Sequence, residues 1–216
     1  MSQEIQRNYW ESTGERRSPR HPVAEAFSRP KLEFARRAMT DLDVATVLDV
    51  GAGNGYFTWL LEAWGSAVAL DFARAMLRQH PARVRVQGDA VVLPFANRSF
   101  DVTFCGNLLH HLPDPAAAVR EMARVARRYV VLVEPNRNNP LMLAFGLVKR
   151  EERGTVWMHR GRLEELLGGA GLELVASATM GSVVPNKTPL ALLPALRIID
   201  GSSPLGFYAV AVGRVT

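Results

Sequence analysis

The stretch from Val47 to Tyr56 constrains the fold more than any other part of this chain. It reads Val-Leu-Asp-Val-Gly-Ala-Gly-Asn-Gly-Tyr, an apolar run with one acid that leads into a glycine-rich turn. Such a pattern is typical of a buried parallel strand whose carboxyl end faces a nucleotide. The glycines leave bare backbone beside the ligand, and the following helix directs its N-terminus at it.

The spacing of the glycines argues against two common nucleotide sites. A dinucleotide fingerprint requires Gly-x-Gly-x-x-Gly, whereas its third glycine position is occupied here by Tyr56. A tyrosine there disfavours close packing of helix on strand, so a nicotinamide dehydrogenase is a distant alternative. The chain has no Gly-x-x-x-x-Gly-Lys-Ser/Thr sequence, which excludes a P-loop.

Two further acids follow the next predicted strands. Residues 66–70 form a short apolar strand before Asp71, where a carboxylate can accept hydrogens from both hydroxyls of a ribose. Residues 84–87 form another strand before Asp89, whose carboxylate can accept from an exocyclic amine such as that of adenine. Together the glycine turn and the two acids favour an adenosine-containing ligand.

A series of short motifs follows in a fixed order. It comprises Asp49/Gly51/Gly53, Asp71, Gly88-Asp89, Leu93-Pro94-Phe95, Ser99-Phe100-Asp101 and His110-His111-Leu112-Pro113-Asp114-Pro115. The series resembles the class I S-adenosylmethionine-dependent methyltransferases. Within them it is most similar to the branch of ubiquinone and menaquinone C-methyltransferases and many natural-product methyltransferases. The resemblance covers about residues 44–133 and is weaker toward the C-terminus.

The sequence predicts one α/β domain with a doubly wound, Rossmann-like sheet, and 216 residues suffice for one such core. Strands are expected at 46–50, 67–70, 84–87, 102–105, 129–133, 172–179 and 206–212, and helices at 24–40, 55–63, 73–79, 116–126 and 162–170. Pro30 is expected to start or break the first helix. The resemblance implies a seven-stranded sheet of order 3-2-1-4-5-7-6 with the last strand antiparallel.

The expected organisation is an N-terminal lid with the first helix (1–40) and a cofactor-binding domain (41–216). Segments at about 136–160 and 184–205 would cover the substrate. The substrate-lid residues would be Tyr9, Trp10, His21, Trp157 and His159. His159 also precedes a predicted helix, and a role at the helix start is the more common one for such a histidine.

The resemblance implies that the chain binds S-adenosyl-L-methionine and releases S-adenosyl-L-homocysteine. The corresponding residues are Asp49, Gly51, Ala52, Gly53, Asp71, Phe72, Met76, Asp89, Ala90 and Asn107. Asp71 would bind the ribose, Asp89 and Ala90 the adenine edge, and Asn107 the methionine tail. Asp49 would support the loop or reach the methionine amino group through water. Phe72 and Met76 would flank the adenine, or else belong to the core.

The implied chemistry is an in-line displacement, in which the protein mainly positions and desolvates the reactants. A base is required only when the acceptor must lose a proton. The candidate catalytic residues are His110, His111 and Glu134, with the alternative that none is needed. We expect His110 to face the pocket and His111 to be structural. Cys105, the only cysteine, is expected in the core rather than as a thiol nucleophile.

No metal site is expected. His110 and His111 are adjacent rather than four residues apart on a helix, and no cluster of acids and histidines is expected around them. The expected function is methyl transfer to O or C of a small, apolar or carrier-linked acceptor. Alternatives are an RNA or protein methyltransferase, and a catalytically inactive cofactor-binding scaffold that works through a partner. The tip of the fourth strand reads Gly-Asn-Leu-Leu, which does not match the Asn/Asp-Pro-Pro-Tyr/Phe motif of amino-group enzymes.

Charge and hydropathy limit the partners. The net charge of +5 comes from 23 Arg and three Lys spread along the chain, so nucleic acid is not expected as a partner. The apolar segments 141–148 and 190–196 either pack on the sheet or line an apolar acceptor pocket and touch a membrane. Neither reaches the ~20 residues of a membrane span, and residues 1–15 lack an apolar leader, so a cytoplasmic location is expected.

Overall fold

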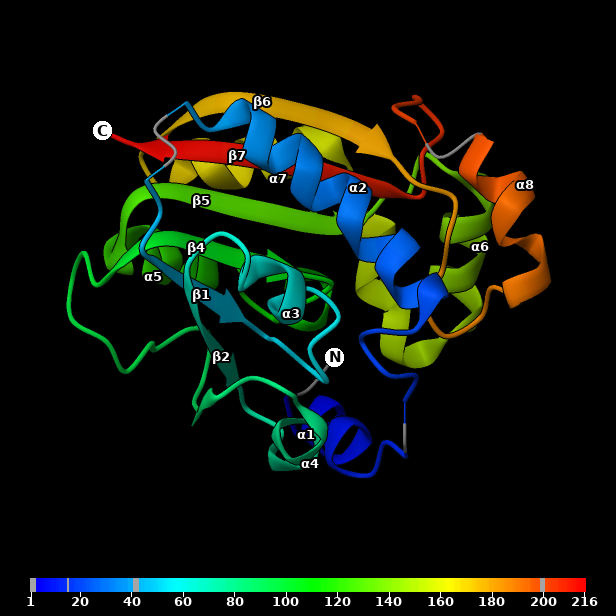
Figure 1. The fold of residues 1–216 in the computed structure, drawn as a ribbon, viewed down its shortest axis with the longest axis horizontal. Helices are drawn as coiled ribbons and strands as arrows, with labels where there is room; N and C mark the ends of the chain where they lie inside the picture. Colours follow the sequence, from blue (N-terminus) through cyan, green and yellow to red (C-terminus); the bar gives the residue numbers. More distant parts are fainter. Residues whose placement is uncertain (1–2, 15, 41–42, 199–200) are drawn as a thin grey trace.

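Seven strands form one mixed sheet of spatial order β3-β2-β1-β4-β5-β7-β6 (Figure 1). The computed structural model describes residues 3–14, 16–40, 43–198 and 201–216. The strands are β1 (Thr46–Val50), β2 (Ser66–Asp71), β3 (Val84–Gln87), β4 (Phe100–Gly106), β5 (Ala126–Pro135), β6 (Leu172–Met180) and β7 (Tyr208–Val215). Strands β1 to β5 pair in parallel, and β7 is antiparallel to β5 and β6. The predicted strand order and antiparallel last strand are confirmed.

Helices cover both faces of this sheet. The α-helices are α1 (Gln3–Glu11), α2 (Pro22–Ala38), α3 (Thr58–Leu61), α4 (Arg74–Gln79), α5 (Pro115–Val125), α6 (Pro140–Val148), α7 (Arg160–Gly169) and α8 (Leu193–Ile198). Three 3-10 helices are η1 (Leu109–His111), η2 (Arg150–Trp157) and η3 (Leu190–Leu192). Helices α2 and α3 lie on one face and α5 and α7 on the other, while α6 and α8 occupy the right-hand end of the view (Figure 1).

The central strands are mostly apolar because both of their faces are covered. In β5, Tyr129, Val131 and Val133 belong to the core cluster under α2 and α3, whereas Val130 and Leu132 belong to the cluster under α5 and α7. All five are at most 1% exposed. This two-sided burial holds the carboxyl ends of the parallel strands in fixed positions, and the candidate site lies along that edge.

Two local predictions are wrong. The helix predicted over 24–40 runs from Pro22 to Ala38 without a break at Pro30, because buried side chains on both sides of the proline, including Phe27 and Leu32, anchor both halves to the sheet. The helix predicted over 55–63 is shorter, since Gly55 has a φ of +94° and cannot be helical.

Some expected boundaries lie outside the described residues. These are residues 1–2 and 15 of the predicted lid, the boundary at 41–42, and residues 199–200 of the second substrate-covering segment. In the part of the chain that the structure describes, every helix is too short or too polar to cross a bilayer.

Candidate cofactor and acceptor site

The turn after β1 has a backbone that requires glycine. Gly51, Gly53 and Gly55 have φ values of +72°, +56° and +94°, which side chains of L-residues rarely adopt. The Gly51 amide donates to the carbonyl of Leu70 at 2.8 Å and so fastens the turn to β2. A Cβ on Gly51 would lie 2.8 Å from the side chain of Leu108. The turn therefore brings bare backbone to the edge of the sheet.

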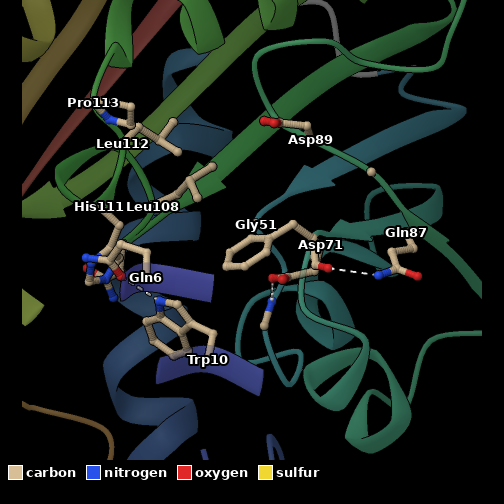
Figure 2. Close-up of a pocket in the computed structure, with 14 residues that line it drawn as sticks. Gln6, Trp10, Gly51, Asp71, Gln87, Asp89, Leu108, His111, Leu112 and Pro113 are labelled. Atoms are coloured by element: carbon tan, nitrogen blue, oxygen red, sulfur yellow. Dashed lines mark hydrogen bonds between the residues drawn. The ribbon is translucent and has the colours of Figure 1, made fainter. Parts of the chain in front are cut away.

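A cavity of about 700 Å³ lies beside this turn at the carboxyl ends of the parallel strands. Figure 2 shows side chains from β2 and β3 on one wall, the loop after β4 on the other, and Gln6 and Trp10 of α1 below. The predicted cofactor residues that line it are Gly51, Gly53, Asp71, Phe72, Asp89 and Asn107. We call it the first cavity.

Asp71 at the end of β2 organises the first cavity. Its Oδ2 accepts from the Gly53 amide at 2.8 Å and its Oδ1 from the Ala73 amide at 2.8 Å, so each oxygen keeps a lone pair for a ligand hydroxyl. Burial raises the pKa of Asp71, and these two amide hydrogen bonds oppose the rise. Asp89 lies across the same space, is exposed, and accepts from the Val91 amide at 3.1 Å.

A hydrogen-bonded relay beneath the turn reaches Asp49, which is 1% exposed. The Ala82 amide donates to Nδ1 of His80 at 3.0 Å, so the neutral ring carries its proton on Nε2, 2.9 Å from Oγ1 of Thr58. The Thr58 hydroxyl donates to Oδ2 of Asp49 at 2.5 Å. Burial lowers the pKa of His80 to about 4 and raises that of Asp49 to about 7.

The structure separates other residues that the sequence placed together. Phe72 lines the first cavity, but Met76 is 1% exposed and lines the neighbouring space instead. Asp49 and Ala52 also line that neighbouring space. Ala90 is buried and lines neither. Of the two side chains expected to flank an adenine, Phe72 lines the first cavity and Met76 lines the neighbouring space.

The neighbouring space is a second cavity of about 400 Å³. It shares Trp10, Gly51, Gly53, Asn107 and His111 with the first, so the two adjoin along the glycine turn and the tip of β4. Its apolar lining includes Phe57, Leu141, Met142, Phe145, Val184, Phe207 and Tyr208. Both expected substrate-covering segments contribute to this lining.

Asn107 stands at the junction of the two cavities. Its φ of +57° places it in the left-handed region, and its backbone amide donates to the carbonyl of Val133 at 2.8 Å. Its buried side-chain Oδ1 has no hydrogen-bond partner among the described residues. A buried oxygen that lacks a hydrogen-bond donor fits a ligand with an amino group, such as the methionine part of S-adenosylmethionine.

His110 and His111 both line the second cavity, but His110 rather than His111 has the structural contacts. The His110 side chain is only 2% exposed, with Nδ1 2.5 Å from Glu134 Oε2 and Nε2 3.1 Å from Glu152 Oε2. Burial disfavours its charge, but the charge and hydrogen bond of Glu134, helped by Glu152, raise the pKa of His110 to about 10. His110 is therefore a protonated link between two carboxylates, although its edge reaches the second cavity.

Glu134 is fully buried and lines neither cavity. Its Oε1 accepts from the amides of Leu108 and Leu109 at 2.8 and 2.7 Å, so it holds the loop after β4. Glu152 comes from η2, 42 residues beyond His110, and was missed because no local pattern marks it. The expectation that no cluster of acids and histidines surrounds His110 and His111 is wrong: these two and Glu152 bring potential metal-ligand atoms within 4.8 Å of one another.

His111 is the histidine that faces both cavities. Its Nδ1 lies 3.2 Å from the carbonyl of Glu151, and its ring meets Trp10 edge to face at 5.2 Å between centroids. Burial, together with the neighbouring positive charge of His110, lowers the pKa of His111 to about 3. The ring is therefore neutral at pH 7.

The five predicted lid residues divide between the site and elsewhere. Tyr9 and Trp10 line the second cavity, and Trp10 also lines the first. His21 instead caps α2, with Nδ1 accepting from the Val23 amide at 3.2 Å. His159 caps α7 by accepting from the Arg162 amide at 3.2 Å, which confirms its predicted role at a helix start. Trp157 is 68% exposed and lines neither cavity.

The cysteine that was weighed as a possible nucleophile is structural. Cys105 lies in β4 with no exposed surface and belongs to the core under α5 and α7. Burial raises the pKa of its thiol well above the ordinary value, which keeps it protonated. The core role predicted for Cys105 is confirmed.

Comparison with known proteins adds sequence relatives. A family model described as a methyltransferase domain matches residues 48–133. A demethylmenaquinone methyltransferase of Roseiflexus sp. (strain RS-1) is 46% identical over 89 residues, or 37% of each chain. That of Roseiflexus castenholzii is 40% identical over 110 residues, or 46% of each chain. The chain thus matches less than half the length of these relatives.

Solved structures add the fold. A Thermotoga maritima protein described as an SAM-dependent methyltransferase, possible histamine N-methyltransferase, has a TM-score of 0.67 at 17% identity, covering 90% of this chain and 91% of that one. Magnesium protoporphyrin IX methyltransferase of Synechocystis PCC 6803, solved with bound SAH, has a TM-score of 0.65 at 15% identity over the full length of both. The chain therefore has the fold of the class I S-adenosylmethionine-dependent methyltransferases, and its residues 48–133 match a methyltransferase domain.

Proposed function

We propose that this chain transfers a methyl group from S-adenosylmethionine to oxygen or carbon of a small, apolar or carrier-linked acceptor. The observation that carries the proposal is the junction of two cavities. One has carboxylates and bare backbone suited to adenosine, and the other adds a group of apolar side chains, among them Met142 and Phe145, to a lining that also holds charged residues such as Lys149 and Glu152. They meet at Gly51, Asn107 and His111, where a methyl group would pass from one ligand to the other.

In this proposal the first cavity holds the cofactor. Asp71 accepts hydrogens from the ribose hydroxyls, Asp89 accepts from the adenine amine, and Asn107 Oδ1 accepts from the methionine amino group. The bound cofactor supplies a methyl group already made electrophilic by its sulfonium. The remaining task of the chain is to hold both reactants in line and to exclude water. Trp10, which lines both cavities, is placed to do the latter.

The second cavity suits an apolar acceptor. Met142 and Phe145 of α6 line it together with Phe207 and Tyr208, and methionine side chains adapt to irregular apolar ligands. The sequence relatives are described as demethylmenaquinone methyltransferases, so a quinol-like acceptor is the first to test. His111, with its lowered pKa, is a weak base, so we assign it to orienting an acceptor hydroxyl rather than to removing its proton.

The experiment that tests this function begins with calorimetric titration of the protein with S-adenosylhomocysteine, with NAD as the control. Micromolar binding of S-adenosylhomocysteine alone supports the cofactor assignment, whereas binding of NAD alone overturns it. Transfer from labelled S-adenosylmethionine is then measured with naphthoquinols, phenols, RNA and protein as acceptors. Cofactor binding without transfer to any of them favours the inactive scaffold, and salt-dependent RNA binding with RNA labelling favours an RNA methyltransferase. We take the cytoplasm as the place of the reaction.

A further inference from the structure

One side of helix α6 carries apolar side chains that face solvent. Leu141, Leu147 and Val148 are 67%, 63% and 83% exposed, and Ala144 between them is also exposed. At about 100° per residue these four positions fall within one arc of about 120° around the helix. They therefore form a single stripe, which we call the α6 stripe, rather than scattered surface residues.

The opposite side of the same helix belongs to the proposed acceptor site. Met142 is 5% exposed and lines the second cavity, as does Phe145. A Cβ on buried Gly146 would lie 3.0 Å from Thr155, so η2 packs closely against this inner side. Leu141, at the start of the stripe, lines the second cavity as well, so the cavity and the outer stripe lie on the two sides of one short helix and meet at its N-terminal end.

The surroundings of the α6 stripe extend its apolar character. Asn139, which caps α6, donates from Nδ2 to the carbonyl of Leu205 at 2.6 Å. This bond brings Leu205, an apolar residue that is 59% exposed, to the start of the helix. Figure 1 shows α6 and α8 at the same end of the molecule.

The charge next to the stripe is basic. Directly after α6 come Lys149, Arg150 and Arg153, all exposed. The two acids in the same segment, Glu151 and Glu152, are only partly exposed, and Glu152 is engaged with His110. Exposed cations beside an apolar helix face suit a surface with negative head groups above an apolar interior.

We infer that α6 docks on the surface of an anionic lipid bilayer, with its outer stripe in the interface and its inner side on the acceptor cavity. The link to the cavity rests on the proposed function and would let an apolar acceptor carried by the bilayer reach the site. A folded protein partner would need acidic side chains to meet the same cations, and a second copy of this chain would present cations to cations. The bilayer is the occupant that satisfies both features at once.

The test is co-sedimentation of the purified chain with vesicles of phosphatidylcholine alone and of phosphatidylcholine mixed with phosphatidylglycerol. We expect binding to the mixed vesicles that weakens as salt is raised, because exposed charges are screened. Replacing Leu147→Gln and Val148→Gln together should weaken binding at least about tenfold. Val92→Gln is the matched control, since Val92 is 71% exposed outside this segment. Arg150→Gln with Arg153→Gln should reduce the preference for anionic vesicles.

Cofactor binding separates failure of the docking from failure of the function. None of the substituted residues lines either cavity, so every variant should keep the wild-type affinity for S-adenosylhomocysteine. A chain that binds S-adenosylhomocysteine but no vesicles overturns the docking and leaves the function standing. Vesicle binding that the α6 substitutions leave unchanged overturns it too, as does a stable dimer in sedimentation that these substitutions dissociate. If the wild type does not bind S-adenosylhomocysteine, the proposed function is contradicted whatever the vesicle experiment shows.

Discussion

The Nδ1 atom of His110 lies 2.5 Å from Oε2 of Glu134, and both side chains are withdrawn from solvent where β4 and β5 end. The other carboxylate oxygen of Glu134 accepts two amides of the loop after β4. On its far side His110 meets Glu152 of η2. The pair therefore fastens the loop that carries His111, and with it the segment that covers the second cavity, to the centre of the sheet.

Breaking this pair should destabilise the fold. His110→Ala leaves the buried carboxylate of Glu134 without its charged partner, and we expect a loss of about 3–5 kcal/mol in the free energy of unfolding. Urea unfolding followed by circular dichroism at pH 7 measures it. The double variant His110→Leu with Glu134→Gln removes both charges and should recover part of the loss. A single variant as stable as the wild type would show that the pair does not hold the loop.

The same pair should make stability depend on pH on the alkaline side. Because the folded pKa of His110 is about 10 and its ordinary value is 6.5, the folded state retains this proton when the unfolded state has lost it. The stabilisation is fully present below about pH 6.5 and decreases as pH rises toward 10. Unfolding of the wild type and of His110→Gln from pH 6 to 10 should show a steeper loss for the wild type, and parallel curves would contradict the assignment.

The fold was largely predictable because its signals are local or come as an ordered series. Strand β5 was predicted from its apolar run at 129–133, and the strand itself extends over Ala126–Pro135. The run marks the strand because a strand that is buried on both faces must be apolar along its centre. The position of β7 between β5 and β6 came from the family resemblance, because strand periodicity carries no information about neighbours. The helix break predicted at Pro30 is wrong because the tendency of proline to interrupt a helix is outweighed by the packing of side chains on both sides of it.

The site was predictable only where its residues stand within a motif. Asp71, Gly51 and Asn107 follow their strands directly and were found at the strand ends, as predicted. Glu152 and the His80–Thr58 contact were missed because 42 and 22 residues separate the partners. For the same reason the sequence does not indicate which of His110 and His111 is structural, because this depends on the contact of His110 with Glu152 of η2.

Substitution of Asp71 tests the cofactor site. On the proposed assignment, Asp71→Ala would deprive the ribose of a charged hydrogen-bond partner and the Gly53 amide of its acceptor, so binding of S-adenosylhomocysteine should weaken by about 1–3 kcal/mol. Calorimetry measures the affinity, and thermal unfolding verifies that the variant is folded. Asp71→Asn is the conservative control, because it keeps an acceptor oxygen. Unchanged affinity in folded Asp71→Ala would remove the ribose role.

Proton release should accompany cofactor binding near neutral pH. Burial raises the pKa of Asp49 to about 7, so this carboxyl is partly protonated at pH 6.5. The positive charge of a bound methionine amino group would lower that pKa, and binding of S-adenosylhomocysteine would then release a fraction of a proton. Calorimetry in buffers of different ionisation enthalpy measures the release. Asp49→Asn should abolish it, whereas Asp89→Asn, across the first cavity from Asp71, should not.

Substitution of His111 distinguishes orientation of the acceptor from general-base catalysis. Removing a general base typically costs about 10²–10⁴-fold in rate, whereas loss of an orienting hydrogen bond costs about tenfold, and we expect the smaller loss for His111→Ala. Since the pKa of His111 is lowered to about 3, the wild-type rate should show no ionisation of this group between pH 5 and 8. Steady-state kcat and KM for the acceptor, measured across that range, give both quantities. A loss of a hundredfold or more in kcat, together with an acid limb that the substitution removes, would instead make His111 the base, because only a group that must be neutral to react imposes both.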